Sequence, residues 1–234
     1  MSDQTWERLG AASGIVVAIL FGVSFVVFLG TDPTSAPRIP DLENAPLDAA
    51  AYIGDHKDAI KTQLLLNSLA MVLFLWFLGS LWSAYRKAEG GPARVSAIAT
   101  AGGIVGTGAV LAGFVFGTAA VQDPNTAGVG ALYTLEVLSI ALGGAAFTVF
   151  FLASAKVILK EGALPAALGF LAVVAGLAAA LGFVSIFAEE GIFNPATGAF
   201  GFWLRFGSFV LWVLFASMAL TAGAGQRATK GRRR

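Results

Sequence analysis

Six long runs of apolar residues constrain the fold of this 234-residue chain more than any other feature of its sequence. A helix needs about 20 predominantly apolar residues to cross the hydrocarbon core of a bilayer. The runs cover residues 9–29, 62–85, 95–119, 130–159, 165–187 and 200–221. They are continuously apolar rather than alternating, which favours helices over a membrane β-barrel. The sequence therefore predicts an all-α bundle of six transmembrane helices.

The composition excludes several function classes. Hydrophobic residues make up 57% of the chain and charged residues 12%, whereas a soluble domain is about 45–50% apolar and about 25% charged. A water-soluble enzyme and a nucleic-acid-binding domain are therefore excluded. The chain has no cysteine and a single histidine, so thiolate chemistry and zinc centres lack ligands. We expect one domain, 1–234, with no catalytic residue, no cofactor, no metal site and no nucleic-acid partner.

The first apolar run is interpreted as a retained membrane anchor, with a secretory signal peptide as the alternative. Residues 1–8, which precede the run, do not carry a net positive charge. The run is also longer than the roughly 7–15 apolar residues of a signal peptide. We therefore count this segment as the first span.

The orientation is predicted from lysine and arginine, which collect in cytoplasmic loops. With the N-terminus inside, 11 of the 15 basic residues lie on the cytoplasmic side. They include the bases of the turn 86–94 and of the tail 222–234, which would lie on the anionic inner leaflet. We expect a multi-pass protein of the plasma membrane (the cell inner membrane of a bacterium), with the lipid bilayer as its partner and both termini in the cytoplasm.

The one long connection, 30–61, is expected on the extracytoplasmic side between the first two spans. Its first half, TDPTSAPRIPDLENAP, contains four prolines and should lack regular structure. Its second half predicts a helix over 48–63, with Tyr52, Ile53 and Ile60 as a narrow apolar stripe. Such a helix would lie along the outer interface or continue into the second span.

Glycines recur at four-residue spacing on one face of several spans. The chain has 29 glycines, and small residues at this spacing let helices approach closely in lipid. The faces are Gly10, Gly14, Ala18 and Gly22; Gly102, Gly106, Gly113 and Gly117; and Gly169, Ala172 and Gly176. We expect these faces to pack within the chain, with a homo-oligomer or a protein partner as the alternative.

Polar side chains inside the spans are costly in lipid and are therefore the functional candidates. Asn67, Glu136 and Arg205 each lie about six residues inside a span, or about 9 Å below its outer end. Opposite charges at matched depth predict an ion pair between Glu136 and Arg205. Polar neighbours that could complete this outer-leaflet polar site are Gln63, Tyr133 and Ser208. The site is a structural clamp between helices or a site for a ligand or an ion; the alternative is that the residues reach the membrane surface independently of one another.

The plan of the chain resembles an uncharacterised class of six-span bacterial membrane proteins that carry a domain of unknown function. The shared features are the glycine-rich first span, the outer loop ending in AYIGDHKDAIKTQLLLNSLA, and the alternation of glycine-rich and aromatic spans. The resemblance covers the whole chain. It implies a six-helix bundle and no particular activity.

Three functions are compatible with these features. The leading hypothesis is a non-enzymatic binding, sensing or accessory protein, because nucleophiles and metal-ligand clusters are missing. The alternative is a small transporter or channel whose outer path is lined by Glu136, Arg205 and Asn67, although the inner halves of the spans carry almost no polar groups. The third is an intramembrane enzyme acting on lipid, for which Glu136 would be the one buried carboxylate.

Overall fold

The structure, a computed structural model, describes residues 3–29, 39–124 and 128–231. This part of the chain is helical and contains no strand. The α-helices are α1 (Asp3–Leu29), α2 (Ala45–Asp55), α3 (Lys57–Glu89), α4 (Arg94–Gln122), α5 (Val129–Glu161), α6 (Ala166–Val184) and α7 (Leu204–Gly231). Short turns of other helix types, η1 (Ser185–Phe187), η2 (Gly191–Phe193) and the π-helix η3 (Ala199–Trp203), lead from α6 into α7.

Six helices long and apolar enough to span a membrane confirm the predicted all-α bundle, and the chain is an integral membrane protein. The helices run past the apolar segments at most of their ends: α3 extends from Lys57 to Glu89, where the apolar run covers 62–85. Polar residues next to an apolar run propagate a helix at little cost once it has been nucleated. Helix α7 likewise continues through most of the tail 222–234, of which 232–234 lie outside the described residues.

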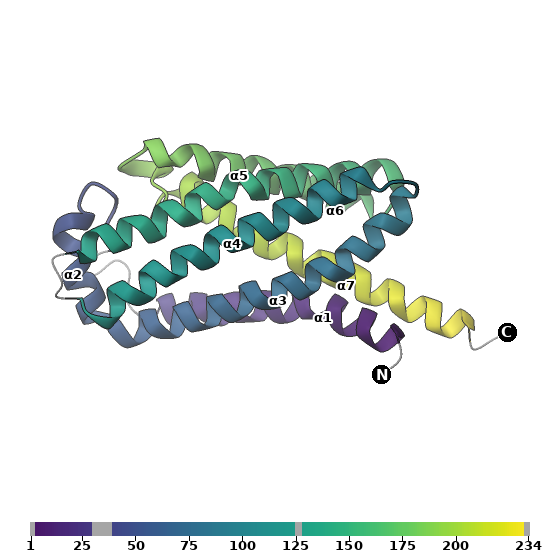
Figure 1. Cartoon of the computed structure of the whole chain (residues 1–234), viewed down its shortest axis with the longest axis horizontal. Coiled ribbons are helices and arrows are strands. Elements are labelled where there is room, and N and C mark those ends of the chain that lie inside the picture. The colour runs from purple at the N-terminus through teal and green to yellow at the C-terminus, as the bar shows by residue number, and fades with distance from the viewer. Residues whose placement is uncertain (1–2, 30–38, 125–127, 232–234) are drawn as a thin grey trace.

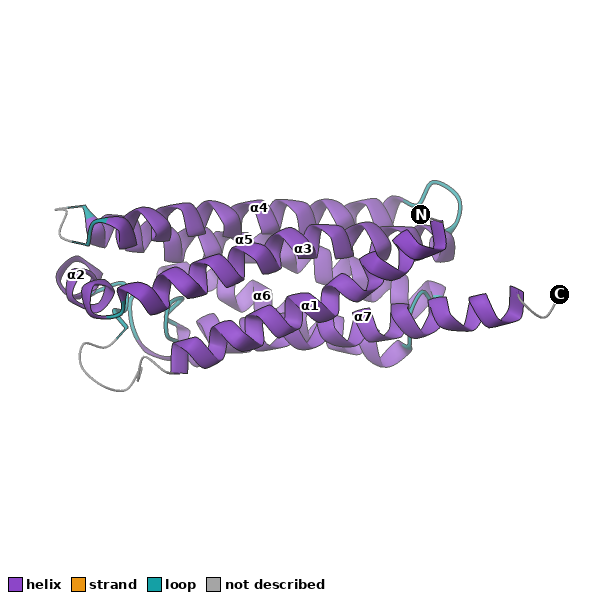
Figure 2. Ribbon diagram, turned by 90° about the horizontal axis from the view of Figure 1, so that it is seen from below, coloured by secondary structure: helices purple, strands orange, loops and turns teal. Residues whose placement is uncertain are grey.

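The six long helices form a closed ring in chain order. Each packs on the long helices next to it in the sequence, and α1 closes the ring by packing on α7. Both termini lie at the same end as the α3–α4 and α5–α6 turns, and α2 lies at the opposite end (Figures 1 and 2). The ring therefore has a terminal end and an α2 end.

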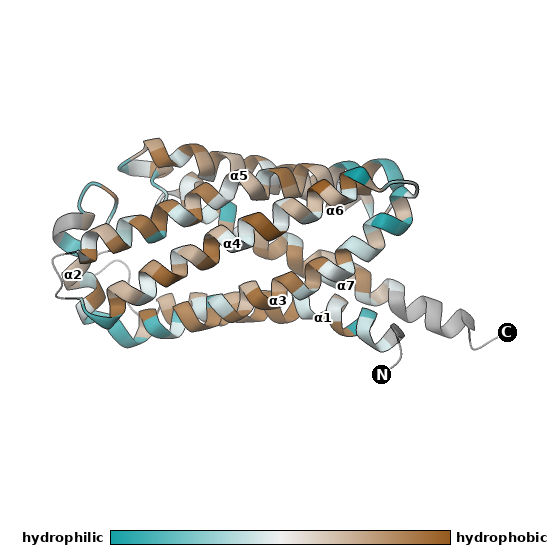
Figure 3. Cartoon of the chain, viewed as in Figure 1, coloured by the Kyte–Doolittle hydropathy of each residue, from teal (hydrophilic) through white to brown (hydrophobic). Residues whose placement is uncertain are grey.

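The surface of the bundle matches a lipid environment. Hydrophilic residues gather at the two ends of the bundle, and apolar residues run along its length (Figure 3). Many large apolar side chains point outward, among them Val26, Leu65, Val115 and Phe170. Exposing these apolar side chains to water would cost free energy, whereas exposing them to lipid does not.

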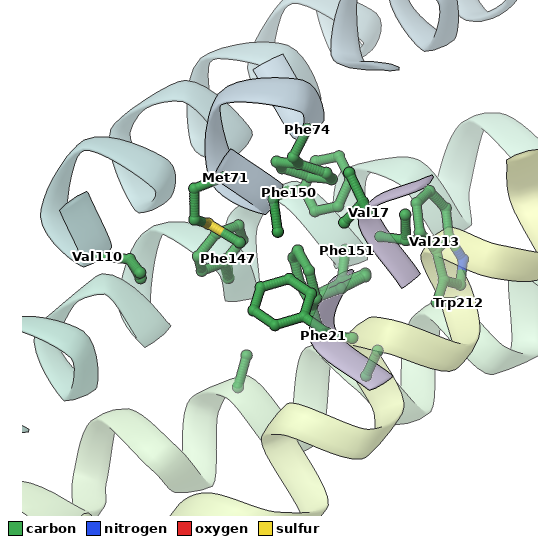
Figure 4. Close-up of a cluster of buried hydrophobic side chains, with 14 of the residues drawn as sticks. Val17, Phe21, Met71, Phe74, Val110, Phe147, Phe150, Phe151, Trp212 and Val213 are labelled. Carbon is green, nitrogen blue, oxygen red and sulfur yellow. The ribbon is translucent and has the colours of Figure 1, made fainter. Parts of the chain in front are cut away.

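The middle of the ring is filled by an aromatic core (Figure 4). The rings of Phe74 and Phe209 lie 5.0 Å apart, and the ring of Trp212 lies 5.4 Å from those of both Phe150 and Phe151 in edge-on contacts. The members, from α3, α5 and α7, are Phe74, Phe147, Phe150, Phe151, Phe209 and Trp212. Edge-on and tilted contacts of this kind are the favoured geometries of aromatic pairs.

The glycine faces allow neighbouring helices to pack backbone to backbone. A Cβ on Gly102 would lie 2.8 Å from the carbonyl oxygen of Ala146, and one on Gly144 would lie 2.7 Å from that of Ala179. Only glycine fits at such distances, so α5 lies tightly against both α4 and α6. Gly14 of α1 likewise lies against Phe77 of α3 and Ser217 of α7. These glycines are thus used within the chain, and an oligomer through a glycine face stays a prediction.

The helix predicted over 48–63 is present, but it begins earlier and is divided. Helix α2 begins at Ala45 with a proline in its first turn and ends at Asp55, and α3 begins at Lys57. The break lies at His56, whose φ of −112° and ψ of 20° leave the helical region. The buried side chains of Tyr52 and Ile53 attach α2 to the bundle. Most of the proline-rich first half of the connection, 30–38, lies outside the described residues.

Candidate functional site

A cavity of about 260 Å³ lies between the aromatic core and the α2 end of the ring. All seven α-helices contribute to its lining. Phe147, Phe151 and Phe209 of the aromatic core form its inner wall, and Tyr52 and Ile53 of α2 lie at its outer end. Its volume is just below the roughly 300–1,000 Å³ of typical small-molecule pockets. We call it the outer cavity.

Five of the six residues predicted for the polar site line the outer cavity: Gln63, Asn67, Tyr133, Glu136 and Arg205. They come from α3, α5 and α7, so the tertiary structure brings together residues that are far apart in the sequence. Ser208 is not among the lining residues. Its hydroxyl donates to the carbonyl oxygen of Arg205, 3.1 Å away on its own helix, and Ser208 therefore supports α7 rather than the cavity.

Glu136 and Arg205 do not form the predicted ion pair. An ion pair between described residues joins Lys87 Nζ and Glu7 Oε1, 2.8 Å apart, but none joins Glu136 to Arg205. Arg205 Nη1 instead donates to the carbonyl oxygen of Ile140 at 3.3 Å. Ile140 lies four residues beyond Glu136 on α5, about 6 Å along the helix axis, so Arg205 bonds to the backbone of α5 instead of to the Glu136 carboxylate.

Two glycines determine where these charged groups lie. A Cβ on Gly117 of α4 would lie 2.5 Å from the carboxylate oxygens of Glu136. A Cβ on Gly182 of α6 would lie 2.6 Å from Arg205 Cδ and 3.0 Å from Arg205 Nη1. Each charged side chain thus rests on a glycine of a different neighbouring helix. The sequence pattern placed Gly117 on a packing face but gave Gly182 no role, because a contact between distant helices leaves no local signal.

We expect a double-mutant cycle on Glu136→Gln and Arg205→Gln in ligand-free protein to show little coupling. Breaking a buried contact pair costs about 3–5 kcal/mol, whereas two charges without direct contact should couple more weakly, because their attraction falls with distance. Unfolding free energies in detergent or nanodiscs would measure it. Coupling of several kcal/mol would show that the two groups are in contact, as the sequence predicted.

The cavity contains polar atoms that have no partner. Gln63 Nε2 and Asn67 Oδ1 are buried and make no hydrogen bond in the described part of the protein. They are a donor and an acceptor one turn apart on α3. A buried polar group left unsatisfied costs about 1–3 kcal/mol, so native structures rarely retain one without a reason. Both side chains line the cavity, and turning the two amide groups would present these atoms to a ligand or water there.

Tyr133 anchors the outer segment of the chain. Its hydroxyl donates to the carbonyl oxygen of Pro40 at 2.7 Å, which ties residues 39–44 to α5. The hydroxyl is buried and already bonded, so Tyr133 shapes the cavity without offering it a free polar atom.

Replacing Tyr133 with phenylalanine should therefore loosen the α2 end. The lost bond is worth about 0.5–1.5 kcal/mol, and amide hydrogen exchange over 39–55 should become faster while exchange in the middle of α4 stays unchanged. Thr148→Val is the matched control, because the Thr148 hydroxyl bonds only to Gly144 of its own helix in the described structure. Unchanged exchange over 39–55 in Tyr133→Phe would contradict the anchoring role.

The aromatic wall between α1 and α7 is the part of the site that sequence reasoning missed. Phe25 and Trp203 pack with ring centroids 5.7 Å apart, and Phe21 and Phe206 with centroids 5.3 Å apart. All four line the cavity, yet Phe25 is also 38% exposed on the outside of the bundle. Towards the terminal end, α1 and α7 meet directly where the Ser217 hydroxyl donates to the Ala11 carbonyl oxygen. This aromatic seam therefore borders both the cavity and the surface of the bundle.

The described residues contain no group of three or more His, Asp or Glu side chains able to hold a metal ion.

Comparison of the chain with models of protein families, with curated proteins and with solved structures found no match. The resemblance to six-span bacterial proteins therefore stays an expectation. What the protein does has to be argued from the outer cavity itself.

Proposed function

We propose that this integral membrane protein is a non-enzymatic binding, sensing or accessory module that holds a small ligand in the outer cavity. The observation that carries the proposal is the pair of amide side chains with an unpartnered atom, Gln63 and Asn67, in a cavity with mainly apolar walls. Ligand pockets typically combine an apolar lining with a few polar groups that orient the ligand.

The aromatic core supports binding over conduction. A channel or transporter that used Glu136, Arg205 and Asn67 would need a path onward to the terminal end. Phe147, Phe151 and Phe209 close the cavity on that side, and the fully buried Phe74, Phe150 and Trp212 lie against them. A conducting state would have to separate these close-packed rings.

A lipid-processing enzyme has less support. Acid–base catalysis needs a proton donor or acceptor within about 2.6–3.2 Å of the group it serves, and usually a second titratable group that orients it. In the described residues the Glu136 carboxylate rests against Gly117 and makes no ion pair. Tyr133, one turn away, uses its hydroxyl on Pro40.

Native mass spectrometry of the purified protein tests the proposed binding function. Wild type should carry a bound small molecule, and Val137→Phe, which fills the cavity from α5, should lose it. Leu135→Phe is the matched control, because Leu135 on the same helix is 44% exposed to lipid and does not line the cavity. The same added mass of bound ligand in wild type and Val137→Phe, or no added mass in wild type, would contradict the proposal.

The proposed location is the plasma membrane, with both termini in the cytoplasm and the α2 end outside. The argument is the 11-to-4 division of the basic residues. Because the chain lacks cysteine, single cysteines report orientation directly. At the exposed positions Glu43 and Ile192, cysteine should react with an impermeant thiol reagent in intact cells, and at Glu161 it should not. The reverse pattern would invert the orientation.

A further inference from the structure

The separated charges of the outer cavity specify a class of ligand, an inference that rests on the proposed binding function. We propose that the cavity binds a zwitterionic group, in which an ammonium and an anionic oxygen of a carboxylate or phosphate lie a few bonds apart. Glu136 receives the ammonium and Arg205 receives the anion. Four polar side chains, Gln63, Asn67, Glu136 and Arg205, line the cavity without using their full hydrogen-bonding capacity.

Arg205 offers unused donors to an anion. A guanidinium carries five N–H donors in a planar fork that matches the oxygens of a carboxylate or phosphate. In the described structure its one hydrogen bond runs from Nη1 to the carbonyl oxygen of Ile140, at 3.3 Å. A guanidinium stays charged in proteins, so a ligand anion is the partner that would offset its burial.

Glu136 offers the complementary acceptor. Its carboxylate lies against Gly117, where the absence of a side chain leaves room for both oxygens. It makes no ion pair with any described residue. A ligand ammonium supplies the donors that the protein does not, and the aromatic walls of the cavity favour a cation as well.

The two charges are not joined directly, which leaves a place for a ligand between them. Arg205 contacts α5 at Ile140, four residues or about 6 Å along the helix axis beyond Glu136. Charge-assisted hydrogen bonds are about 2.8 Å long, so a ligand with both charges can bridge a gap that the side chains do not close themselves. The amide groups of Gln63 and Asn67, which also line the cavity, each bring a donor and an acceptor. The resulting balance of charge matches a zwitterion, and a ligand with one charge leaves the other side chain unmatched.

Two sources could supply this chemistry. One is the headgroup of a zwitterionic lipid such as phosphatidylethanolamine, which would reach the cavity from the outer leaflet through the aromatic seam of Phe25 and Trp203. The other is a free amino acid from the aqueous phase, entering past Tyr52 and Ile53 at the α2 end. The volume of about 260 Å³ holds either a headgroup or a small amino acid.

Binding to the full chain in phosphatidylglycerol nanodiscs tests the proposal, measured by native mass spectrometry and tryptophan fluorescence. The aqueous probes are leucine, N-acetylleucine, which lacks the ammonium, and leucinamide, which lacks the carboxylate. The lipid probe is phosphatidylethanolamine added to the nanodisc, compared with the anionic host lipid. Wild type should bind leucine or phosphatidylethanolamine and discriminate against every probe that lacks one of the charges.

Four variants then assign the charges. Glu136→Gln and Arg205→Gln should each weaken binding of the zwitterion by about tenfold or more. The exposed Glu161→Gln on α5 and Arg94→Gln on α4 are matched controls and should bind as wild type does. If a cavity variant fails to fold, the discrimination among probes by wild type still decides the question.

Each outcome has one meaning. Binding of phosphatidylethanolamine without leucine identifies the lipid source, and binding of leucine identifies the aqueous source. Binding of leucinamide, N-acetylleucine or phosphatidylglycerol as tight as that of the zwitterions would overturn the proposal of a zwitterionic ligand. The proposed binding function would still stand in that case if the bound molecule is lost in Val137→Phe. Absence of binding by any probe to wild type would also overturn the proposal of a zwitterionic ligand.

Discussion

Replacing Trp212 with alanine is expected to lower the free energy of unfolding by about 3–5 kcal/mol. Trp212 is fully buried, its ring contacts Phe150 and Phe151, and its Nε1 donates to the carbonyl oxygen of Leu168 at 3.1 Å. Lipid is as apolar as the core, so the loss comes from the cavity left behind and the missing hydrogen bond rather than from transfer to water. Steric trapping or reversible denaturation in bicelles would measure it.

Two further variants separate these causes. Trp212→Phe retains a ring but loses the bond to Leu168, and it should cost about 1 kcal/mol for the bond and a smaller cavity term. Leu211→Ala, at a position 48% exposed to lipid, should change stability by less than about 0.5 kcal/mol. A loss in Leu211→Ala as large as that in Trp212→Ala would show that the aromatic core does not hold the ring together.

Two glycine-to-alanine changes in the same helix are expected to have opposite signs. In α4, Gly102→Ala places a methyl group 2.8 Å from backbone atoms of Ala146 and Phe150 and should cost about 1–3 kcal/mol by forcing α4 and α5 apart. Gly108→Ala meets nothing within 4 Å and should gain about 0.5–1 kcal/mol from helix propensity.

Thermal unfolding of the two variants in one lipid mixture gives the comparison directly. The two variants share the helix, the substitution and the added methyl group, so they differ only in the packing environment of the substituted residue. Equal shifts for Gly102→Ala and Gly108→Ala would contradict the backbone-to-backbone packing of α4 on α5.

The sequence anticipated most of the polar site because depth in a membrane can be counted along a helix. Asn67, Glu136 and Arg205 share one distance from the outer ends of their spans, and Gln63 lies one turn from Asn67 on the same helix face; all four line one cavity. The predicted Glu136–Arg205 contact was wrong because counting residues does not determine how a helix is rotated. Gly117 and Gly182 direct the two side chains to different neighbouring helices.

Helix α2 likewise combines features that the sequence predicts with features that only the tertiary structure decides. Tyr52 and Ile53 were recognised as a buried stripe because apolar residues at helical spacing must find a partner surface. The break at His56 and the bond from Tyr133 to Pro40 had no sequence signal, since both depend on how the segment crosses the end of the bundle.

The sequence by itself determined that the chain is an all-α membrane protein with six long spans, because a backbone in lipid must satisfy its hydrogen bonds internally and only long apolar helices do so here. It also determined which few polar residues lie inside the spans. Only the tertiary structure decided that the spans close into a ring in chain order, with an aromatic core below a cavity. Lipid provides almost no hydrophobic force to select helix partners, so close-range shape complementarity, which is invisible in a linear pattern, makes that choice.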